Sequence, residues 1–157
     1  MQDWMLKAFS MGPHVVERML RVFPHDRLDD RIEKDRYTAR EVIAHLADYE
    51  QHVLEAFRIA KLKPGGKIEG YDPDERCATH NFGEKDVYRE GEVFESRRLM
   101  TVDFLRTFTE EDWSKTFVTP SGRTVVAKDF FTAILAHDLE HLDQLSAYLA
   151  TEVATIV

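Results

Sequence analysis

Two histidines four positions apart carry the clearest chemical signal in this sequence. His137 and His141 lie in the segment Ile134-Leu-Ala-His-Asp-Leu-Glu-His-Leu-Asp-Gln-Leu, whose apolar residues recur at the spacing of a helix. Positions four apart share one face of a helix and lie about 6 Å apart along its axis. Since zinc–imidazole contacts measure roughly 2.0 to 2.1 Å, two rings placed in this way can reach one metal ion.

His45 is the third candidate ligand and comes from a different part of the chain. The residues around it are mostly apolar: Val42, Ile43, Leu46 and Tyr49. This pattern directs the ring toward the protein interior or its edge. Three neutral imidazoles leave coordination positions open to water or substrate, which is typical of a catalytic site. Asp48 and Gln144 lie about one helical turn beyond the ligands, where they could orient the rings or a bound water.

The same residues admit other interpretations. A single histidine on an apolar face is more often a hydrogen-bonded core residue than a ligand. The run from His137 to His141 also fits the H-x-x-E-H signature of inverted zinc peptidases, with Glu140 as general base. Only residues 142–157 follow it, however, and they offer no suitable carboxylate ligand. The chain has no Glu-x-x-His motif, which argues against a bundle di-iron site.

Cysteine content and charge restrict the chemistry further. Cys77 is the only cysteine, so nitrogen and oxygen atoms must hold any metal ion, and an ordinary loop thiol is favoured over a nucleophile. The formal net charge of −8 opposes binding to nucleic acid. No apolar run approaches the roughly 20 residues of a membrane span, and the N-terminus lacks the pattern of a secretory signal. We expect no membrane association and a cytoplasmic location.

Four helices are predicted to position the candidate ligands. Apolar spacing, the proline at Gly12-Pro13 and the capping-box pattern Thr38-Ala-Arg-Glu support the helix assignments. The predicted helices span residues 12–23, 38–63, 87–108 and 127–152. With no repeat or linker in 157 residues, this pattern predicts a single all-α domain, 1–157, built as an antiparallel or mixed four-helix bundle.

Two connections between the helices stand out. Residues 64–86 are rich in glycine, proline and polar side chains, and they predict a long loop between the second and third helices that is a candidate cover for a site. Residues 117–126, around Pro120-Ser-Gly, predict a short hairpin-like excursion before the fourth helix. Arg97 falls on the apolar stripe of the third helix, where it either extends its charge to the surface or receives a substrate carboxylate.

The order and spacing of these motifs resemble the DinB/YfiT-like superfamily. The resemblance rests on Glu41-Val-Ile-Ala-His-Leu-Ala-Asp and on the segment from Ile134 to Leu145, with Arg36-Tyr-Thr and Thr109-Glu-Glu-Asp-Trp before two of the helices. It extends over nearly the whole chain. It implies a four-helix bundle, often homodimeric, with a divalent ion such as nickel or zinc on a histidine triad. The positions that match the triad are His45, His137 and His141.

The resemblance also implies a class of activity. Several members of the family are thiol S-transferases or thiol-dependent isomerases that use bacillithiol, mycothiol or a similar low-molecular-weight thiol. We therefore expect a metal-dependent transferase, or a hydrolase-like enzyme, that acts on a small molecule. The alternative is a non-catalytic bundle that binds a metal ion or a small ligand. The sequence assigns no catalytic residue.

Overall fold

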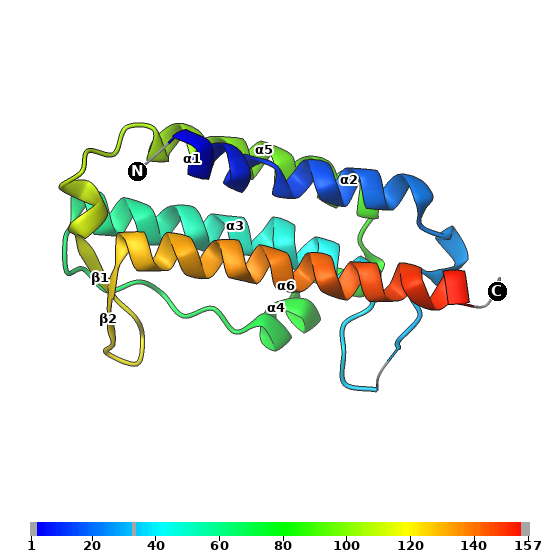
Figure 1. The fold of residues 1–157 in the computed structure, drawn as a ribbon. Helices are drawn as coiled ribbons and strands as arrows, with labels where there is room; N and C mark the ends of the chain where they lie inside the picture. Colours follow the sequence, from blue (N-terminus) through cyan, green and yellow to red (C-terminus); the bar gives the residue numbers. More distant parts are fainter. Residues whose placement is uncertain (1–2, 33, 155–157) are drawn as a thin grey trace.

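The computed structural model describes residues 3–32 and 34–154, and most of them are helical (Figure 1). Within these residues there are six α-helices, three short 3-10 helices and two strands. The α-helices are α1 (Asp3–Ser10), α2 (Gly12–Val22), α3 (Ala39–Leu62), α4 (Pro73–Thr79), α5 (Val87–Leu105) and α6 (Ala127–Ala154). The 3-10 helices are η1 (His25–Arg27), η2 (Phe82–Glu84) and η3 (Asp112–Ser114), and the strands are β1 (Thr116–Val118) and β2 (Thr124–Val126).

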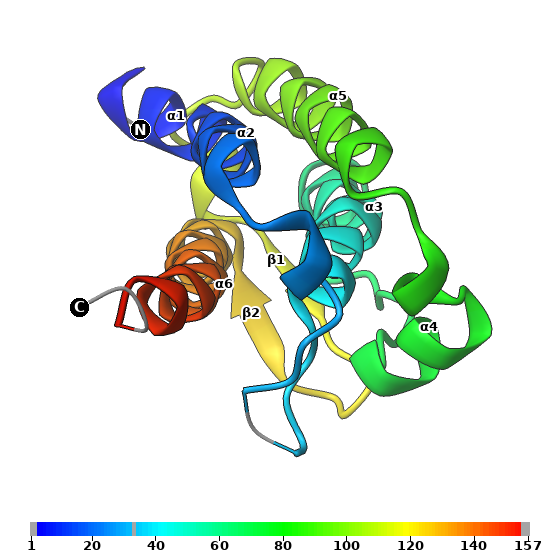
Figure 2. The same ribbon diagram turned by 90° about the vertical axis from the view of Figure 1, so that its right-hand side faces the viewer.

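Four rods of helix form the body of the protein. The short helices α1 and α2 follow each other along one rod, and α3, α5 and α6 supply the other three (Figures 1 and 2). The chain runs in one direction in α2 and α6 and in the opposite direction in α3 and α5 (Figure 1). The bundle is therefore mixed. Because α3 and α5 are parallel, the connection between them must return along the whole length of the bundle.

The start of α3 is set by a local signal that the sequence predicts correctly. The Thr38 side chain accepts a hydrogen bond from the Glu41 backbone N–H at 3.2 Å, and the Glu41 carboxylate accepts one from the Thr38 backbone N–H at 2.8 Å. This reciprocal capping box satisfies two of the backbone donors that a helix start leaves unpaired. Such a cap is typically worth about 1 kcal/mol, and it fixes the residue at which α3 begins.

Three features of the predicted helix pattern differ from the structure. An additional helix, α1, precedes the expected first helix, and the expected loop 64–86 contains α4 and η2. The side chain of Asp72 accepts hydrogen bonds from the backbone of Asp74 and Glu75, and Pro73 suits the first helical turn. These two local features start α4 within a segment whose composition otherwise favours loops. The third predicted helix also ends at Leu105 rather than 108.

The predicted hairpin is present and is joined to the long connection. Strands β1 and β2 pair antiparallel, with Phe117 opposite Val125. At the tip of the turn, Gly122 adopts φ +87°. Residues other than glycine rarely adopt this backbone conformation, because their Cβ atom makes it strained. Backbone hydrogen bonds from Ile68 to Val118 and from Val118 to Gly66 attach the start of the connection to β1. No helix among the described residues is long and apolar enough to cross a membrane.

The buried core has two apolar clusters. One contains Phe9, Phe57 and Phe131, and the other contains Val16, Ile43 and Leu145. A buried arginine, Arg98, contacts an aromatic ring from each cluster: its guanidinium carbon lies 3.8 Å from the Phe9 ring centroid and 4.9 Å from that of Phe94. A polar layer therefore lies between two apolar regions of the bundle.

Candidate metal centre

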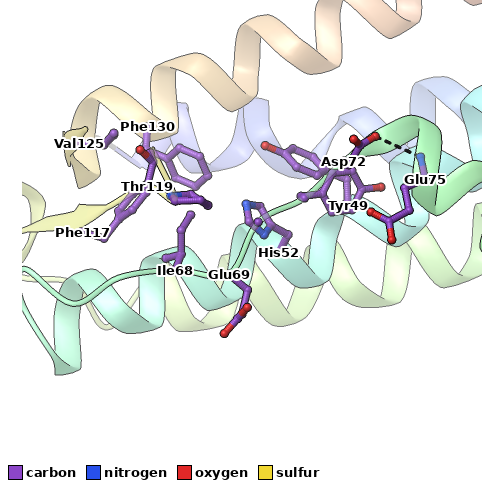
Figure 3. A pocket seen from close by; sticks show the side chains of 13 residues that line it. Tyr49, His52, Ile68, Glu69, Asp72, Glu75, Phe117, Thr119, Val125 and Phe130 are labelled. Atoms are coloured by element: carbon purple, nitrogen blue, oxygen red, sulfur yellow. Dashed lines mark hydrogen bonds between the residues drawn. The ribbon is translucent and has the colours of Figure 1, made fainter. Parts of the chain in front are cut away.

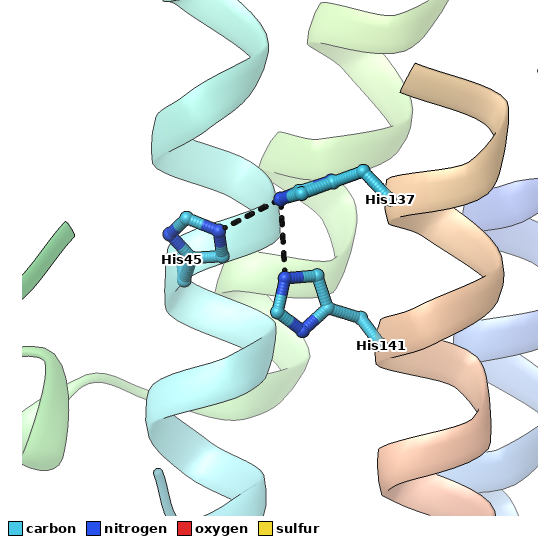
Figure 4. Close-up of side chains that lie close together, drawn as sticks. All are labelled: His45, His137 and His141. Atoms are coloured by element: carbon cyan, nitrogen blue, oxygen red, sulfur yellow. Dashed lines mark hydrogen bonds between the residues drawn. The ribbon is translucent and has the colours of Figure 1, made fainter. Parts of the chain in front are cut away.

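The three histidines singled out in the sequence meet between α3 and α6. His45 reaches across from α3, and His137 and His141 reach back from successive turns of α6 (Figure 4). The Nε2 atom of His137 lies 3.1 Å from Nε2 of His45 and 3.1 Å from Nε2 of His141. One ligand atom from each residue lies within 4.8 Å of the other two. The structure therefore brings together all three predicted ligands.

The groups around Nδ1 of His45 determine which of its two ring nitrogens carries the proton. The Tyr71 hydroxyl lies 3.2 Å from His45 Nδ1 and donates its proton to Asp48 Oδ2 at 3.0 Å. A phenol has one proton to donate, so the Tyr71 oxygen is left to accept the Nδ1–H of His45. In this neutral tautomer, assigned from the partners, Nε2 carries a free lone pair directed at His137.

His141 is oriented in the same way by a residue from its own helix. Its Nδ1 lies 3.1 Å from Oε1 of Gln144, an amide oxygen that accepts hydrogen bonds and cannot donate them. Nδ1 therefore carries the proton, and Nε2 presents a lone pair to the centre of the triad. Gln144 was expected from the sequence to orient a ring, and this contact gives it a partner for that role.

The arrangement of the nitrogens fits a metal ion. Two lone pairs converge on His137 Nε2, which can donate one proton to one of them at most. A cation bound by all three nitrogens resolves the conflict. Nitrogens bound to one ion at about 2.0 to 2.1 Å lie roughly 3 to 3.4 Å apart in tetrahedral or octahedral geometry, and the two 3.1 Å separations in the triad match this spacing.

Two of the triad residues, His45 and His141, favour the neutral form that binds metals. Burial, helped by the nearby His141 and His137, lowers the pKa of His45 to about 3. Burial and the neighbouring His137 also lower the pKa of His141. Both imidazoles are therefore neutral near pH 7, the state in which histidine binds a metal ion.

Asp48 is held in place by an arginine from the long connection. Both oxygens of the Asp48 carboxylate accept hydrogen bonds from Arg76, at 2.6 Å from Nη2 and 2.9 Å from Nε. Burial acts to raise the pKa of Asp48, but the hydrogen bonds from Arg76 and Tyr71 outweigh it and lower the pKa. The sequence predicted that Asp48 would orient a ligand; the structure places Tyr71 between Asp48 and the ring.

A buried ion cluster fixes the position of α6 beside the triad. Asp138, which follows His137, accepts hydrogen bonds from Arg98 at 2.6 Å and 3.1 Å, and Arg98 also donates to Glu50 at 2.8 Å. Arg98 is 1% exposed and Glu50 is 2% exposed. Gly12 passes so close that an added Cβ would lie 3.1 Å from Asp138 Oδ2. The cluster therefore ties α6 to α3, α5 and the N-terminal rod.

A comparison with family models places the chain in a family. The model described as the DinB superfamily matches residues 8–145, which include all three triad histidines. The chain belongs to the DinB superfamily. A comparison with curated proteins gave no match.

Solved structures show the same fold as this DinB protein at low sequence identity. YfiT from Bacillus subtilis, described as a probable metal-dependent hydrolase with an unusual four-helix bundle topology, matches with a TM-score of 0.89 and 16% identity over 96% of this chain and 86% of YfiT. A DinB-like protein from Bacillus cereus ATCC 10987 matches with a TM-score of 0.64 and 16% identity over 94% of this chain and 90% of that one. These matches confirm the predicted bundle.

A third structural relative is larger. The mycothiol-dependent maleylpyruvate isomerase matches with a TM-score of 0.72 and 18% identity over 91% of this chain. The chain spans 60% of the length of that isomerase. The likeness therefore concerns the bundle that the two proteins share.

Two cavities flank the triad of this DinB protein. One, of about 550 Å³, is lined by His141 and Gln144 together with Tyr37 and Glu140. The other, of about 530 Å³, lies between the hairpin and the long connection (Figure 3). Its lining includes the apolar side chains Phe117, Val125 and Phe130 and the polar rings of Tyr49, His52 and Tyr71. The long connection, predicted to cover a site, lines this second cavity.

Other residues considered in the sequence lie apart from the triad. Arg97 donates a hydrogen bond to the Ala47 backbone carbonyl at 2.6 Å and lines a separate cavity between α3 and α5; its role in binding a substrate carboxylate stays a prediction. His52 lines the cavity beside the hairpin, with its ring stacked 5.4 Å from that of Tyr49. Cys77 is half-buried in α4, and burial raises the pKa of its thiol, which opposes a nucleophilic role.

Sequence reasoning missed several residues at the site, among them Tyr71, Arg76 and Arg98. Tyr71 lies in a segment with no periodic pattern, so no local signal marks it. Arg98, by contrast, follows Phe94 by four residues and precedes Val102 by four, and all three are buried. Arg97 has a comparable spacing, because it follows Phe94 by three residues and precedes Thr101 by four, so helical spacing alone does not choose between the two arginines.

Proposed function

We propose that this protein binds a divalent transition-metal ion, zinc or nickel, through Nε2 of His45, His137 and His141, and uses it in a reaction of a small molecule. The observation that carries the proposal is the convergence of three Nε2 atoms, two of which have their lone pairs fixed by Tyr71 and Gln144. Three protein ligands leave room for a further ligand, as in catalytic metal sites.

The reaction class that we propose is the transfer of a low-molecular-weight thiol to an electrophile. It is supported by the family resemblance and by the shared fold of an isomerase that depends on mycothiol. A bound divalent ion would lower the pKa of a coordinated thiol and so supply the thiolate, which is the nucleophilic form. In the transfer, a carbon–sulfur bond forms, the bond to the leaving group breaks, and the thiol proton passes to solvent.

The residues of the chain would hold the reactants and shield them. The cavity that His141 lines has space for a small molecule beside the triad. The connection that carries Tyr71 covers the other side of His45, where rings from α3 and the connection pack at centroid distances of 5.6 Å for Tyr49 and 5.8 Å for Tyr71. This packing limits the access of water to His45, whose side chain is buried.

A non-catalytic binding bundle is the second candidate. It is favoured by one observation: the side chains that contact the outer nitrogens of two triad rings, Tyr71 for His45 and Gln144 for His141, hold these rings in place, and neither partner is a free general base. This protein would bind the ion, or a small ligand on it, without turnover.

Metal analysis followed by a coupled assay separates the candidates. Protein purified without an affinity tag is analysed for zinc, nickel, copper and iron, and the metal-free protein is titrated with each ion. We expect close to one equivalent of ion per chain. Less than about a tenth of an equivalent, with no uptake on titration, would refute the metal proposal. With metal bound, consumption of mycothiol or bacillithiol together with an alkyl halide identifies the transferase, whereas the binding bundle gives no turnover.

We further propose that the protein works as a homodimer in the cytoplasm. The dimer rests on the family resemblance, and exposed apolar side chains such as Trp4, Met11 and Leu139 offer surface for a partner copy. The compartment agrees with the chemistry, because low-molecular-weight thiols and an unpaired cysteine such as Cys77 both belong to a reducing environment.

A further inference from the structure

Tyr71 links the long connection to the innermost ligand of the triad. Its hydroxyl lies 3.2 Å from His45 Nδ1 and 3.0 Å from Asp48 Oδ2. His45 is the most deeply buried of the three histidines, at 4% exposure. The contact crosses from one segment to another, because Tyr71 precedes α4 whereas His45 and Asp48 lie one turn apart on α3. A change in this hydroxyl therefore acts directly on a ligand.

We propose that Tyr71 is a positioning residue for the metal centre, through which the charge of Asp48 acts on His45. This inference rests on the proposed metal site and deepens it. The carboxylate of Asp48 accepts the Tyr71 proton, and the Tyr71 oxygen in turn accepts the Nδ1–H of His45. The relay leaves Nε2 of His45 unprotonated, which is the state that a metal ion needs.

The far end of the relay is anchored by charge. Arg76 donates two hydrogen bonds to Asp48, and its guanidinium carbon lies 5.9 Å from the Tyr71 ring centroid. Arg76 and Tyr71 both belong to the long connection. The same segment therefore brings to Asp48 both the Tyr71 hydroxyl and the positive charge of Arg76. Asp48 keeps its negative charge beside this arginine, so Tyr71 has a strong acceptor for its proton.

Loss of the hydroxyl should weaken metal binding without emptying the site. In the variant Tyr71→Phe the ring remains, but the Nδ1–H of His45 loses its acceptor, and the competing tautomer with the proton on Nε2 becomes accessible. Removing the partner of a metal-bound histidine typically weakens metal affinity by about 10- to 100-fold. We expect a loss in this range for zinc, measured by competition with a chelator of known affinity.

Tyr37→Phe is the matched control. The Tyr37 hydroxyl donates to Asp74 at 2.6 Å and so ties α4 of the same connection to the bundle. Its ring also packs near His45, at a centroid distance of 6.2 Å. This variant loosens the connection but leaves the hydrogen bond from His45 to Tyr71 in place. We expect its zinc affinity to stay within about twofold of that of the unaltered protein.

A second variant tests whether Asp48 acts through Tyr71. Asp48→Asn keeps an oxygen acceptor but removes the charge, and we expect a smaller loss of zinc affinity than in Tyr71→Phe. In the double variant that combines Tyr71→Phe with Asp48→Asn, residue 48 has no route to His45. The loss of zinc affinity should therefore equal that of Tyr71→Phe alone. If Tyr71→Phe melts far below the unaltered protein, Asp48→Asn carries the test, with a several-fold loss expected.

A measurement without metal separates this inference from the proposed function. The nitrogen-15 chemical shifts of the imidazoles in the metal-free protein report which nitrogen carries the proton. We expect His45 to be protonated on Nδ1, and to shift toward the other tautomer in Tyr71→Phe. If the protein binds no metal ion, the proposed function fails, and this tautomer measurement alone decides the role of Tyr71.

Three results would overturn the inference. The first is zinc affinity in Tyr71→Phe within about twofold of that of the unaltered protein. The second is an equal loss in Tyr37→Phe, which would assign the effect to the anchoring of the connection rather than to the hydroxyl. The third is an unchanged tautomer of His45 in the metal-free Tyr71→Phe protein.

Discussion

Nε2 of His45 lies 3.1 Å from Nε2 of His137, although the two residues are 92 positions apart in the chain. Two nitrogen atoms without a hydrogen between them repel at this distance, and a shared proton relieves only one of the two such contacts that His137 makes. A bound cation relieves both. The relationship therefore links the antiparallel packing of α3 and α6 directly to the proposed chemistry.

Replacing one ligand should separate metal binding from folding. In His141→Ala the helix propensity of α6 rises by a few tenths of a kcal/mol, and the ring lost is only half-buried. We expect the metal-free variant to melt close to the metal-free unaltered protein, and tight metal binding to be abolished. Added zinc should raise the melting temperature of the unaltered protein and leave that of the variant almost unchanged.

Two outcomes would contradict that prediction. An unfolded variant would mean that the triad is needed for folding itself. Unchanged zinc affinity would mean that His141 is a core histidine satisfied by Gln144 rather than a ligand. Replacement of His14, an exposed histidine in α2 outside the triad, serves as the control and should leave the zinc affinity unaltered.

Acid should destabilise the metal-free protein at a pH where its carboxylates are still charged. Burial holds the pKa of His45 near 3 in the folded protein, whereas an unfolded histidine titrates near 6.5. Below about pH 6.5 the unfolded chain therefore binds more protons than the folded one, and the free energy of unfolding falls as the pH falls toward 3. The contribution of His45 reaches about 1.4 kcal/mol per pH unit. His141, whose pKa is also lowered, adds in the same direction.

Urea unfolding of the metal-free protein between pH 7 and pH 5 measures this effect. The window lies above the range in which aspartates and glutamates take up protons, so the histidines dominate the slope. His45→Gln should reduce the slope, because the glutamine does not titrate. A free energy of unfolding that is constant from pH 7 to pH 5 would show that the folded protein accommodates the protonated histidines.

Loss of the buried arginine should be costly. Arg98→Met leaves the carboxylates of Glu50 and Asp138 buried without their cation, and Oε1 of Glu50 already has no hydrogen-bond partner in the described part of the chain. Breaking a buried ion pair from one side typically destabilises a protein by about 3 to 5 kcal/mol. We expect a loss of this size in the free energy of unfolding, measured by urea denaturation.

The neighbouring arginine provides the control for that experiment. Arg97 is half-buried and donates one hydrogen bond to a backbone carbonyl, so Arg97→Met should cost only about 1 kcal/mol. Equal effects of the two substitutions would show that the buried cluster around Arg98 contributes no more than an ordinary hydrogen bond. Arg98→Lys, which keeps the charge but not the paired donors, should fall between the two.

The proposed homodimer is tested by mass in solution. Light scattering across a wide range of protein concentration should return twice the chain mass of 18.3 kDa. Substitution of the exposed Leu139 on α6, which is 66% exposed, by glutamate tests whether this surface belongs to the dimer contact, because a charge buried in an apolar interface opposes association. A monomer mass at all concentrations would reject the dimer.

Features that depend on residues close together in the chain could be predicted from the sequence alone. The capping box between Thr38 and Glu41 joins residues three positions apart, and the pair His137 and His141 shares a helix face because four residues make about one turn. The hairpin before α6 also follows from its local turn residues. Each of these depends on backbone geometry that a short segment adopts by its own hydrogen bonds, so spacing alone is enough to predict it.

Contacts between side chains from distant segments could not be predicted in this way, because they depend on how the helices pack. The relay from Asp48 through Tyr71 to His45 depends on the path of a connection whose residues follow no periodic pattern. The buried contact of Arg98 with Glu50 and Asp138 depends on which face of α5 meets α3 and α6. Since these contacts join separate segments, their distances are set by the packing of whole helices, and local spacing carries no information about them.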